Sequence, residues 1–363
     1  MGKRILLSGY FGFDNLGDEA ILEAECARWR QLAPGVELAV LMDNKERAQE
    51  LELKAYPRQS PLQIWKAINE ADLVVSGGGG LFQDSTGFKS VMYYGAILAL
   101  ASIARKPSIL FSQGFGPIKT NYGRLLAKAL LPLATRATFR DQPSLEEFKE
   151  YAPQVPAEVT ADPVFLLEPG SLQASQEVWQ RCQLPDPAAP VVIVALRPWL
   201  DLKLEMWAHA LNEWGESIPE ADRPQLLLVP FQYWYDQGVA KRLGSLLRLK
   251  HALAPPLKVG EMLALMAAPQ VELVVAMRLH ALIMAAVAGK ACLSVSYDPK
   301  VQRTAQRCGY LNLDWEGLAG GSLKTSLERV WQERVANARE AQSRLPQLRE
   351  QAERAFTLAG ELL

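Results

Sequence analysis

Arg278 and His280 lie two residues apart, where the strand-like run at 273–276 gives way to an apolar helical pattern. The start of a helix offers N–H groups without intrahelical partners and the positive end of the helix dipole. A guanidinium there can hold a phosphate or carboxylate through two parallel hydrogen bonds. Imidazole exchanges protons near neutral pH, so His280 could serve as an acid or base beside the bound anion. The alternative for His280 is an ordinary packed histidine.

Further polar residues follow two other strand-like runs of the second half. Arg197 ends the run at 191–196, and Tyr297 and Lys300 follow the run at 291–296. Ligands of open α/β sheets bind beyond the carboxyl ends of the strands. We therefore expect Arg197, Arg278 and Lys300 to hold one small dianion, with Tyr297 lining the site. A structural salt bridge is the alternative for Arg197.

The first half carries three glycine-rich loops after strand-like runs, at 9–19, 76–84 and 112–117. Glycine lets the backbone approach a ligand closely, although the loops match neither the dinucleotide fingerprint nor the phosphate-binding P-loop. Asp84 could act as a general base toward a hydroxyl group, or be a solvated loop residue. The other residues expected to line a binding edge are Gly12, Asn15, Asp18, Gly78, Gly79 and Gln113.

These loops and strand ends require a scaffold in which strands alternate with helices. Short apolar runs alternate with helical patterns in both halves, which is typical of parallel sheets covered by helices. A proline-rich stretch at 185–190 marks the junction. The sequence predicts an α/β fold of two Rossmann-like domains facing a central cleft. We expect residues 1–170 to form the first domain, 171–325 the second, and 326–363 a helical tail.

Composition narrows the functional classes. The chain has 363 residues, 49% hydrophobic and 22% charged, with a formal net charge of -1. This balance is typical of a soluble globular protein and gives no support to nucleic-acid binding. Four widely spaced cysteines, without a CxxC pair, favour neither a metal site nor disulfides and fit a cytoplasmic protein. No metal and no cofactor are expected.

Two segments bear on membranes. The N-terminus lacks the apolar stretch of a signal peptide, and the longest uncharged apolar run, 90–104, is too short to span a bilayer. The basic amphipathic pattern at 123–136, with Arg124, Lys128 and Arg136, could lie on the inner face of an anionic membrane. An ordinary packed helix is the alternative.

Taken in order, these motifs resemble those of the polysaccharide pyruvyl transferase family, and most closely its CsaB-type bacterial members. The segments that carry the resemblance extend to about residue 310. They are the loops at 9–19, 76–84 and 113–117, Asp141 and its neighbours, and the segments 161–163, 277–280 and 297–300.

The resemblance implies a GT-B-like fold, phosphoenolpyruvate as the donor, and transfer of pyruvate to a sugar as a ketal. For CsaB-type members it implies an N-acetylmannosamine unit of a lipid-linked cell-wall polymer precursor as the acceptor, and a polymer that anchors surface-layer proteins. When the family pattern is matched to this sequence, it places four residues in the active site: Arg278, His280, Arg197 and Asp84. We expect the donor on the second domain and the acceptor on the first.

Two other functions fit the same residues. A glycosyltransferase of this architecture would use a nucleotide-sugar donor instead of phosphoenolpyruvate. A non-catalytic sugar-phosphate-binding protein would hold the ligand and release no phosphate.

Overall fold

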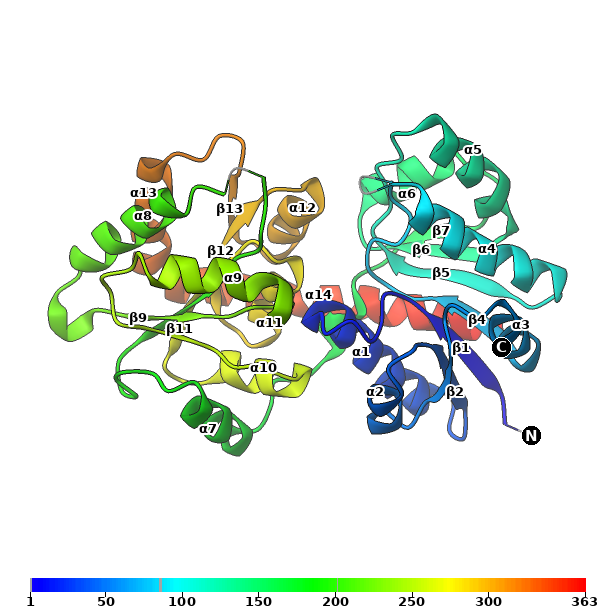
Figure 1. The fold of residues 1–363 in the computed structure, drawn as a ribbon, viewed down its shortest axis with the longest axis horizontal. Coiled ribbons are helices and arrows are strands. Elements are labelled where there is room, and N and C mark those ends of the chain that lie inside the picture. The colour runs from blue at the N-terminus through cyan, green and yellow to red at the C-terminus, as the bar shows by residue number, and fades with distance from the viewer. Residues whose placement is uncertain (1, 85–86, 201) are drawn as a thin grey trace. The chain divides into compact units, whose positions relative to one another are not determined.

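The computed structural model describes residues 2–84, 87–200 and 202–363. The chain divides into two compact units, each built on a parallel sheet (Figure 1). Unit 1 comprises Met1–Asp14, Asp18–Leu166 and Gln347–Leu363, and unit 2 comprises Asn15–Gly17 and Leu167–Pro346. The prediction of two Rossmann-like α/β domains is confirmed.

The observed division differs in detail from the sequence-based one. The main segment of unit 1 ends at Leu166, whereas the sequence predicted a first domain up to residue 170. The expected tail is not a separate element, because its residues are shared between the two units. Helix α13 (Gly320–Gln332) and the first part of α14 (Arg334–Gly360) belong to unit 2, whereas residues 347–363 belong to unit 1.

Unit 1 has a seven-stranded sheet with strand order β3-β2-β1-β4-β5-β6-β7. All neighbouring strands pair in parallel, so every carboxyl end lies at the same edge. The strands are β1 (Arg4–Ser8), β2 (Glu37–Leu41), β3 (Lys54–Tyr56), β4 (Leu73–Ser76), β5 (Ser108–Gln113), β6 (Arg136–Phe139) and β7 (Ala157–Val159). The central strands β4 and β5 are buried along their whole length, as expected for a sheet covered on both faces.

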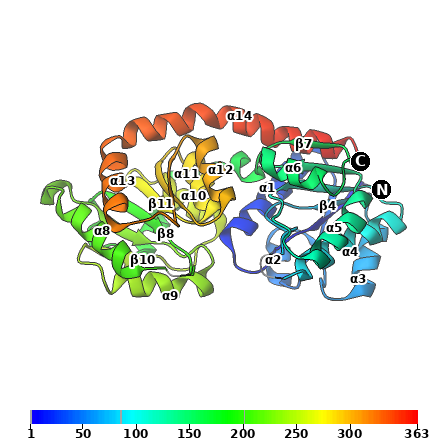
Figure 2. The same cartoon turned by 90° about the horizontal axis from the view of Figure 1, so that it is seen from above.

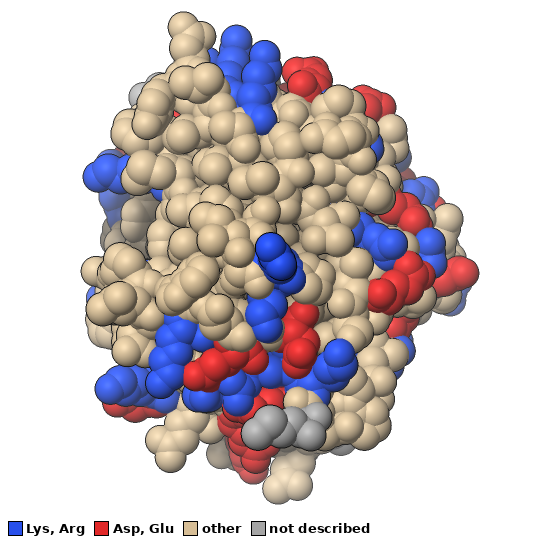
Figure 3. Space-filling view, turned by 90° about the vertical axis from the view of Figure 1, so that its right-hand side faces the viewer, with Lys and Arg blue, Asp and Glu red and all other residues tan. Residues whose placement is uncertain are grey.

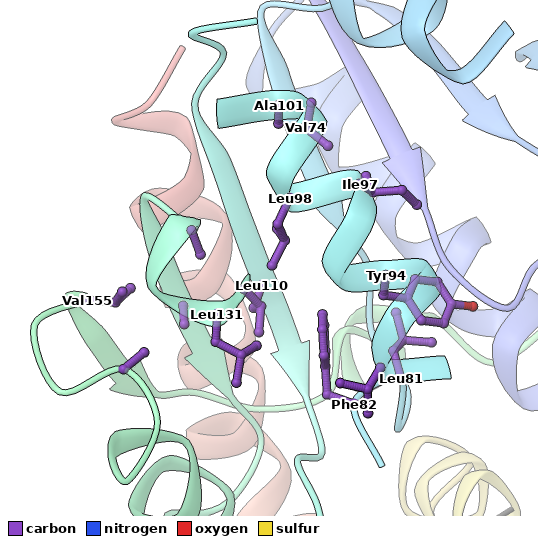
Figure 4. Close-up of a cluster of buried hydrophobic side chains, with 14 of the residues drawn as sticks. Val74, Leu81, Phe82, Tyr94, Ile97, Leu98, Ala101, Leu110, Leu131 and Val155 are labelled. Carbon is purple, nitrogen blue, oxygen red and sulfur yellow. The ribbon is translucent and has the colours of Figure 1, made fainter. Parts of the chain in front are cut away.

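Helices cover both faces of this sheet (Figure 2). Helices α3 (Pro61–Glu70), α4 (Lys89–Ile103) and α5 (Asn121–Leu130) lie on one face. Their apolar side chains pack with those of the strands, as Leu98 of α4 and Leu110 of β5 show (Figure 4).

On the opposite face, Trp29 of α1 (Leu16–Leu32) packs edge-on against Phe356 of α14, with ring centroids 5.4 Å apart. Unit 1 also contains α2 (Lys45–Glu50) and α6 (Gln142–Lys149). The carboxyl-terminal part of α14 therefore completes the core of unit 1.

Unit 2 has a six-stranded parallel sheet with strand order β10-β9-β8-β11-β12-β13. The strands are β8 (Val191–Ala195), β9 (Gln225–Leu228), β10 (His251–Leu253), β11 (Val271–Ala276), β12 (Ala291–Ser296) and β13 (Leu311–Asp314). The helices are α7 (Leu172–Arg181), α8 (Leu204–Glu216), α9 (Tyr233–Gly244), α10 (Val259–Ala267), α11 (Leu279–Val287) and α12 (Pro299–Cys308), besides α13. Strands β8, β11 and β12 stand side by side, so the segments after them meet at one edge.

Candidate functional site

Arg278 is the N-cap residue of α11 and is mostly buried. Its guanidinium binds the carboxylate of Asp236 with two hydrogen bonds: Nε lies 3.1 Å from Oδ2, and Nη2 bonds to Oδ1. Asp236, in the first turn of α9, also accepts the backbone N–H groups of Phe231 and Gln232, at 3.1 and 2.9 Å. Arg278 is thus held in one orientation, with its Nη1 group outside these two bonds.

His280, in the first turn of α11, lies against a segment from the first glycine loop. Residues Asn15–Gly17 belong to unit 2, where the Leu16 N–H donates to the Phe231 carbonyl at 2.8 Å and Asn15 pairs with Gln232. A Cβ atom added to Gly17 would stand 2.1 Å from His280 Nδ1. Only glycine leaves room for the imidazole, so Gly17 and His280 form one packed arrangement. Sequence reasoning assigned Asn15 to the first domain; the structure groups it with unit 2.

Arg197 and Arg278 follow paired strands at equivalent positions. Ala195 of β8 is in register with Ala276 of β11, and each arginine comes two residues later. The Arg197 guanidinium donates to the Tyr297 hydroxyl at 2.6 Å and lies 4.7 Å from the centre of its ring. Trp199 stacks on the same guanidinium at 5.3 Å. The structure therefore brings Arg197 and Tyr297 into contact, and convergence of both arginines on one anion stays a prediction.

Lys300 lies in the first turn of α12, at the same edge. Asp298 caps this helix, and its Oδ2 atom is 3.1 Å from Lys300 Nζ. The lysine side chain remains about one-third exposed, since its relative accessibility is 34%. A cation with a partly exposed partner can still bind an anion, so its donor-binding role stays a prediction.

At the strand ends of unit 1, the glycines have the conformations that close packing requires. Gly12 and Gly79 adopt positive φ values of 81° and 93°. The Asp18 carboxylate lies against Gly79, since an added Cβ would be 3.1 Å from its Oδ1 atom. A larger residue at either glycine would strain the backbone, which fixes the shape of this edge.

Gln113 requires a correction, because it is fully buried and does not line a surface. Its Nε2 group donates to the Ser76 carbonyl at 2.9 Å and to the Ser76 hydroxyl at 3.0 Å. Residues Gly79 and Gln113 also pair in parallel. Gln113 therefore holds the second glycine loop against β5 through its hydrogen bonds to Ser76. It can influence a ligand only by fixing the position of that loop.

Asp84 is buried and holds the segment that leads into α5. Its carboxylate accepts the N–H groups of Lys119 and Thr120, at 2.7 and 2.8 Å, and the Thr120 hydroxyl at 2.6 Å. Although burial opposes the charge, these hydrogen bonds and the nearby Arg124 hold the pKa of Asp84 below its ordinary value. A low pKa and three donors suit an anchor better than a base, so the catalytic role of Asp84 stays a prediction.

Glu25, on the buried side of α1, was not anticipated from sequence. It is fully buried, and its Oε1 atom accepts the Gly78 N–H at 3.3 Å. Burial is the main cause that raises its pKa to about 8, with a further contribution from the Asp162 charge. A Cβ on Gly77 would stand 2.8 Å from Glu25 Oε1, which shows how closely the second glycine loop packs on this carboxyl group. A glutamate in a mixed helical pattern carries no sequence signal for such burial.

Asp162 itself pairs with Arg140, and this ion pair is also buried, with Nη1 and Oδ2 3.1 Å apart. Across the described ranges 2–84, 87–200 and 202–363, no group of three or more His, Cys, Asp or Glu side chains is placed to hold a metal ion. Nor does any helix in those ranges have the length and apolar character needed to cross a membrane.

The model of the polysaccharide pyruvyl transferase family matches residues 15–299, most of the chain. The match includes the glycine loops from Asn15 onward, Arg197, Arg278 and His280. The chain belongs to the polysaccharide pyruvyl transferase family. No curated protein matches its sequence.

Solved structures similar to this family member are GT-B-type enzymes. Anabaena HepE in complex with UDP-glucose is 15% identical, with a TM-score of 0.61 and coverage of 99% of this chain and 98% of that chain. UDP-GlcNAc 2-epimerase of Neisseria meningitidis bound to UDP-GlcNAc is 14% identical, with a TM-score of 0.61 and coverage of 98% and 99%. A Rickettsia africae glycosyltransferase is 9% identical, with a TM-score of 0.62 and coverage of 100% and 99%. At these identities the likeness establishes the GT-B fold alone.

Proposed function

We propose that this pyruvyl transferase family member moves pyruvate from phosphoenolpyruvate to a sugar as a cyclic ketal and releases phosphate. The observation that carries the proposal is the strand-end edge of unit 2 in a chain of this family. There Arg278, oriented by Asp236, begins α11, and His280 follows it against Gly17. Phosphoenolpyruvate carries a carboxylate and a phosphate, the anions that guanidinium groups and helix N-termini bind best.

In the proposed reaction a general acid first protonates the methylene carbon of phosphoenolpyruvate, giving an oxocarbenium-like centre at its second carbon. A sugar hydroxyl attacks that carbon and loses its proton to a base. The carbon–oxygen bond to phosphate then breaks. A second hydroxyl of the same sugar attacks and closes the ketal, and its proton leaves with the phosphate. One donor and one diol thus give one ketal and one hydrogen phosphate.

In this mechanism Arg278, Arg197 and Lys300 hold the donor and stabilise the charge of the departing phosphate. We assign His280 to phosphate contact and proton transfer. The two alternatives are that it donates the proton to the methylene carbon or that it only binds the phosphate. Tyr297 keeps the Arg197 guanidinium in place through its hydroxyl. Asp84 is the proposed base for the sugar hydroxyl, although its hydrogen bonds favour a positioning role.

For the acceptor we propose the CsaB-type substrate, an N-acetylmannosamine unit of a lipid-linked cell-wall polymer precursor. The support is the motif resemblance, which includes the glycine loops of unit 1. Gly12 in the first of these loops is partly exposed, whereas Gly78 and Gly79 are buried and do not line a surface as expected from sequence. These two glycines shape the edge by close packing of the backbone, with the Gly78 N–H on Glu25 and the Gly79 carbonyl on the Gly114 N–H. The pyruvylated polymer would anchor surface-layer proteins, and the enzyme would act in the cytoplasm.

The test is mass spectrometry of a lipid-linked disaccharide ending in N-acetylmannosamine after incubation with the protein and phosphoenolpyruvate. We expect a mass gain of one pyruvate less one water, with an equal amount of phosphate released. Blocking either of the two reacting hydroxyls should abolish the product. Transfer of a sugar from a nucleotide-sugar donor, with no pyruvylated product, would favour the glycosyltransferase alternative. Ligand binding without phosphate release would favour the non-catalytic one.

A further inference from the structure

The helical layer formed by α3, α4 and α5 exposes an unusual share of apolar side chains. Half of the large apolar side chains that are exposed in the described chain lie on it or beside it. They are Leu62, Trp65, Phe88, Met92, Ile103, Tyr122, Leu125 and Leu133. A water-soluble surface normally scatters such side chains singly, so a concentration on one layer points to a contact surface.

The same part of the chain is depleted of negative charge. Between Asp84 and Asp141 the sequence has no acidic residue. It has eight basic residues there: Lys89, Arg105, Lys106, Lys119, Arg124, Lys128, Arg136 and Arg140. Because the whole chain has a formal net charge of only -1, this segment is a local positive region in an otherwise balanced protein.

The structure separates the basic residues that point outward from those used inside unit 1. Arg136 starts β6 and bonds to the Leu358 carbonyl and the Glu361 carboxylate, so it is not on the basic helix expected from sequence. Arg140 is buried with Asp162. Four exposed basic residues lie at the start of α4, just before α5 or on α5: Lys89, Lys119, Arg124 and Lys128. Arg105 is exposed as well, beyond the other end of α4.

Apolar and basic groups are combined on the two helices. Phe88, at the start of α4, packs edge-on against Tyr122 in the first turn of α5, with ring centroids 4.8 Å apart. Leu125 follows one turn later and is 63% exposed. We define the α4–α5 face as Phe88, Met92, Tyr122 and Leu125 with the four exposed basic residues Lys89, Lys119, Arg124 and Lys128. Figure 3 shows unit 1 from the right-hand side of Figure 1, where uncharged side chains form a broad area with both Lys or Arg and Asp or Glu along its edges.

We propose that the α4–α5 face docks on an anionic lipid surface. Aromatic and leucine side chains next to lysines and arginines are the combination by which interfacial helices bind such a surface. The apolar groups enter the headgroup region, while the cations stay at the anionic headgroups. The four exposed cations of the face select an anionic surface. Asp84, which lies beside them in the fold, is buried and accepts the N–H groups of Lys119 and Thr120. This inference does not depend on the reaction proposed above.

The test is flotation of the full-length protein with vesicles, in the absence of any sugar or phosphoenolpyruvate. Vesicles of phosphatidylcholine alone are compared with vesicles containing 30% phosphatidylglycerol, a composition of roughly the charge density at which polybasic segments bind. We expect binding to the anionic vesicles only, weakened by high salt. Lys119→Gln/Lys128→Gln should bind roughly 25-fold more weakly, since each lysine near the surface contributes about a fivefold change. Leu125→Ser should also reduce binding.

Matched controls use exposed residues elsewhere in unit 1. Lys3→Gln/Lys45→Gln changes the net charge equally, and Leu32→Ser on α1 removes an exposed leucine. Both controls should bind anionic vesicles like the unchanged protein. The inference is overturned if the unchanged protein ignores anionic vesicles, if the control variants lose as much binding as the test variants, or if the face binds nucleic acid and not vesicles. Thermal unfolding of each variant checks that the fold is intact.

Discussion

The strand-end edges of the two units differ in the charge they carry and in how it is held. In unit 2, Arg278 is fixed by Asp236, Arg197 by Tyr297 and Trp199, and Lys300 stands beside Asp298. In unit 1 the edge consists of glycine turns supported from beneath by Gln113 and by Glu25. We propose that the first edge binds a small anion and that the second contributes to the acceptor side. Under this proposal, similar folds acquire different binding chemistry through the residues that follow each strand.

The largest effect should come from Arg278→Ala, in unit 2. We expect pyruvyl transfer to fall by roughly 1,000-fold, because the variant loses a group that stabilises the departing phosphate. The free energy of unfolding should also fall by about 3–5 kcal/mol, because Asp236 stays buried without its partner. Phosphate release and urea denaturation measure the two effects.

The double variant Arg278→Met/Asp236→Asn separates these effects. The asparagine can still accept the Phe231 and Gln232 N–H groups, so most of the stability should return while activity stays low. Recovery of transfer together with stability would show that Arg278 has only a structural task.

Glu25→Gln concerns the edge of unit 1. We expect this variant to have a higher free energy of unfolding near neutral pH. The pKa of about 8 in the folded chain lies above that of an exposed glutamate. The unfolded carboxyl therefore releases its proton as pH rises through about 4.5, whereas the folded one holds it until about pH 8, so stability declines across this window. At pH 7 the variant should be about 3 kcal/mol more stable, and below about pH 4.5 the two proteins should be equal. Parallel stability curves from pH 4 to pH 8 would show that Glu25 is ionised when folded.

Gly17→Ala tests the packing of the first loop on His280. The added Cβ must displace the imidazole, from which it would stand 2.1 Å away. A displacement near 1 Å lowers catalysis by roughly 100-fold, so we expect a drop of about 10- to 100-fold in kcat. Gly238→Ala is the matched control, because its Cβ would meet nothing within 4 Å. Equal kcat values for the two variants would exclude a role of this packing in the reaction.

Asp84→Asn decides between the two tasks of Asp84, the proposed base and an anchor for the segment before α5; its hydrogen bonds favour the anchor, for which the effect on chemistry is the smallest of this series. An asparagine keeps one acceptor oxygen but loses part of the contact to Lys119 and Thr120, so stability should fall by about 1–2 kcal/mol. If Asp84 only positions this segment, kcat should fall by less than about tenfold. A loss above about 100-fold at unchanged thermal stability would instead establish Asp84 as the base.

The structural features that were predicted correctly from the sequence are those that depend on a local pattern of residues. Apolar runs located β4, β8 and β11, and the position of Arg278 and His280 at the start of a helix was correct. Sequence reasoning missed the short elements α2, β3 and β10, whose three to six residues give too little periodicity to be read. The basic amphipathic pattern at 123–136 extends beyond the actual helix, since α5 ends at Leu130 and Pro132 follows in a 3-10 turn. Asp236 and Glu25 were missed because their partners, Arg278 and Gly78, are distant in the chain and meet only in the folded units.

The central claim is that the unit 2 edge binds phosphoenolpyruvate. The most direct measurement is thermal unfolding of the full-length protein with phosphoenolpyruvate, beside UDP-glucose at the same concentration, for the unchanged protein and for Arg278→Lys. A ligand at 100 times its Kd stabilises the fold by about 2.7 kcal/mol, so a clear rise in Tm is expected for phosphoenolpyruvate with the unchanged protein. Lysine cannot reproduce the bonds of a guanidinium, so the variant should lose most of that rise. Stabilisation by UDP-glucose alone, or an equal rise with phosphoenolpyruvate in both proteins, would contradict the claim.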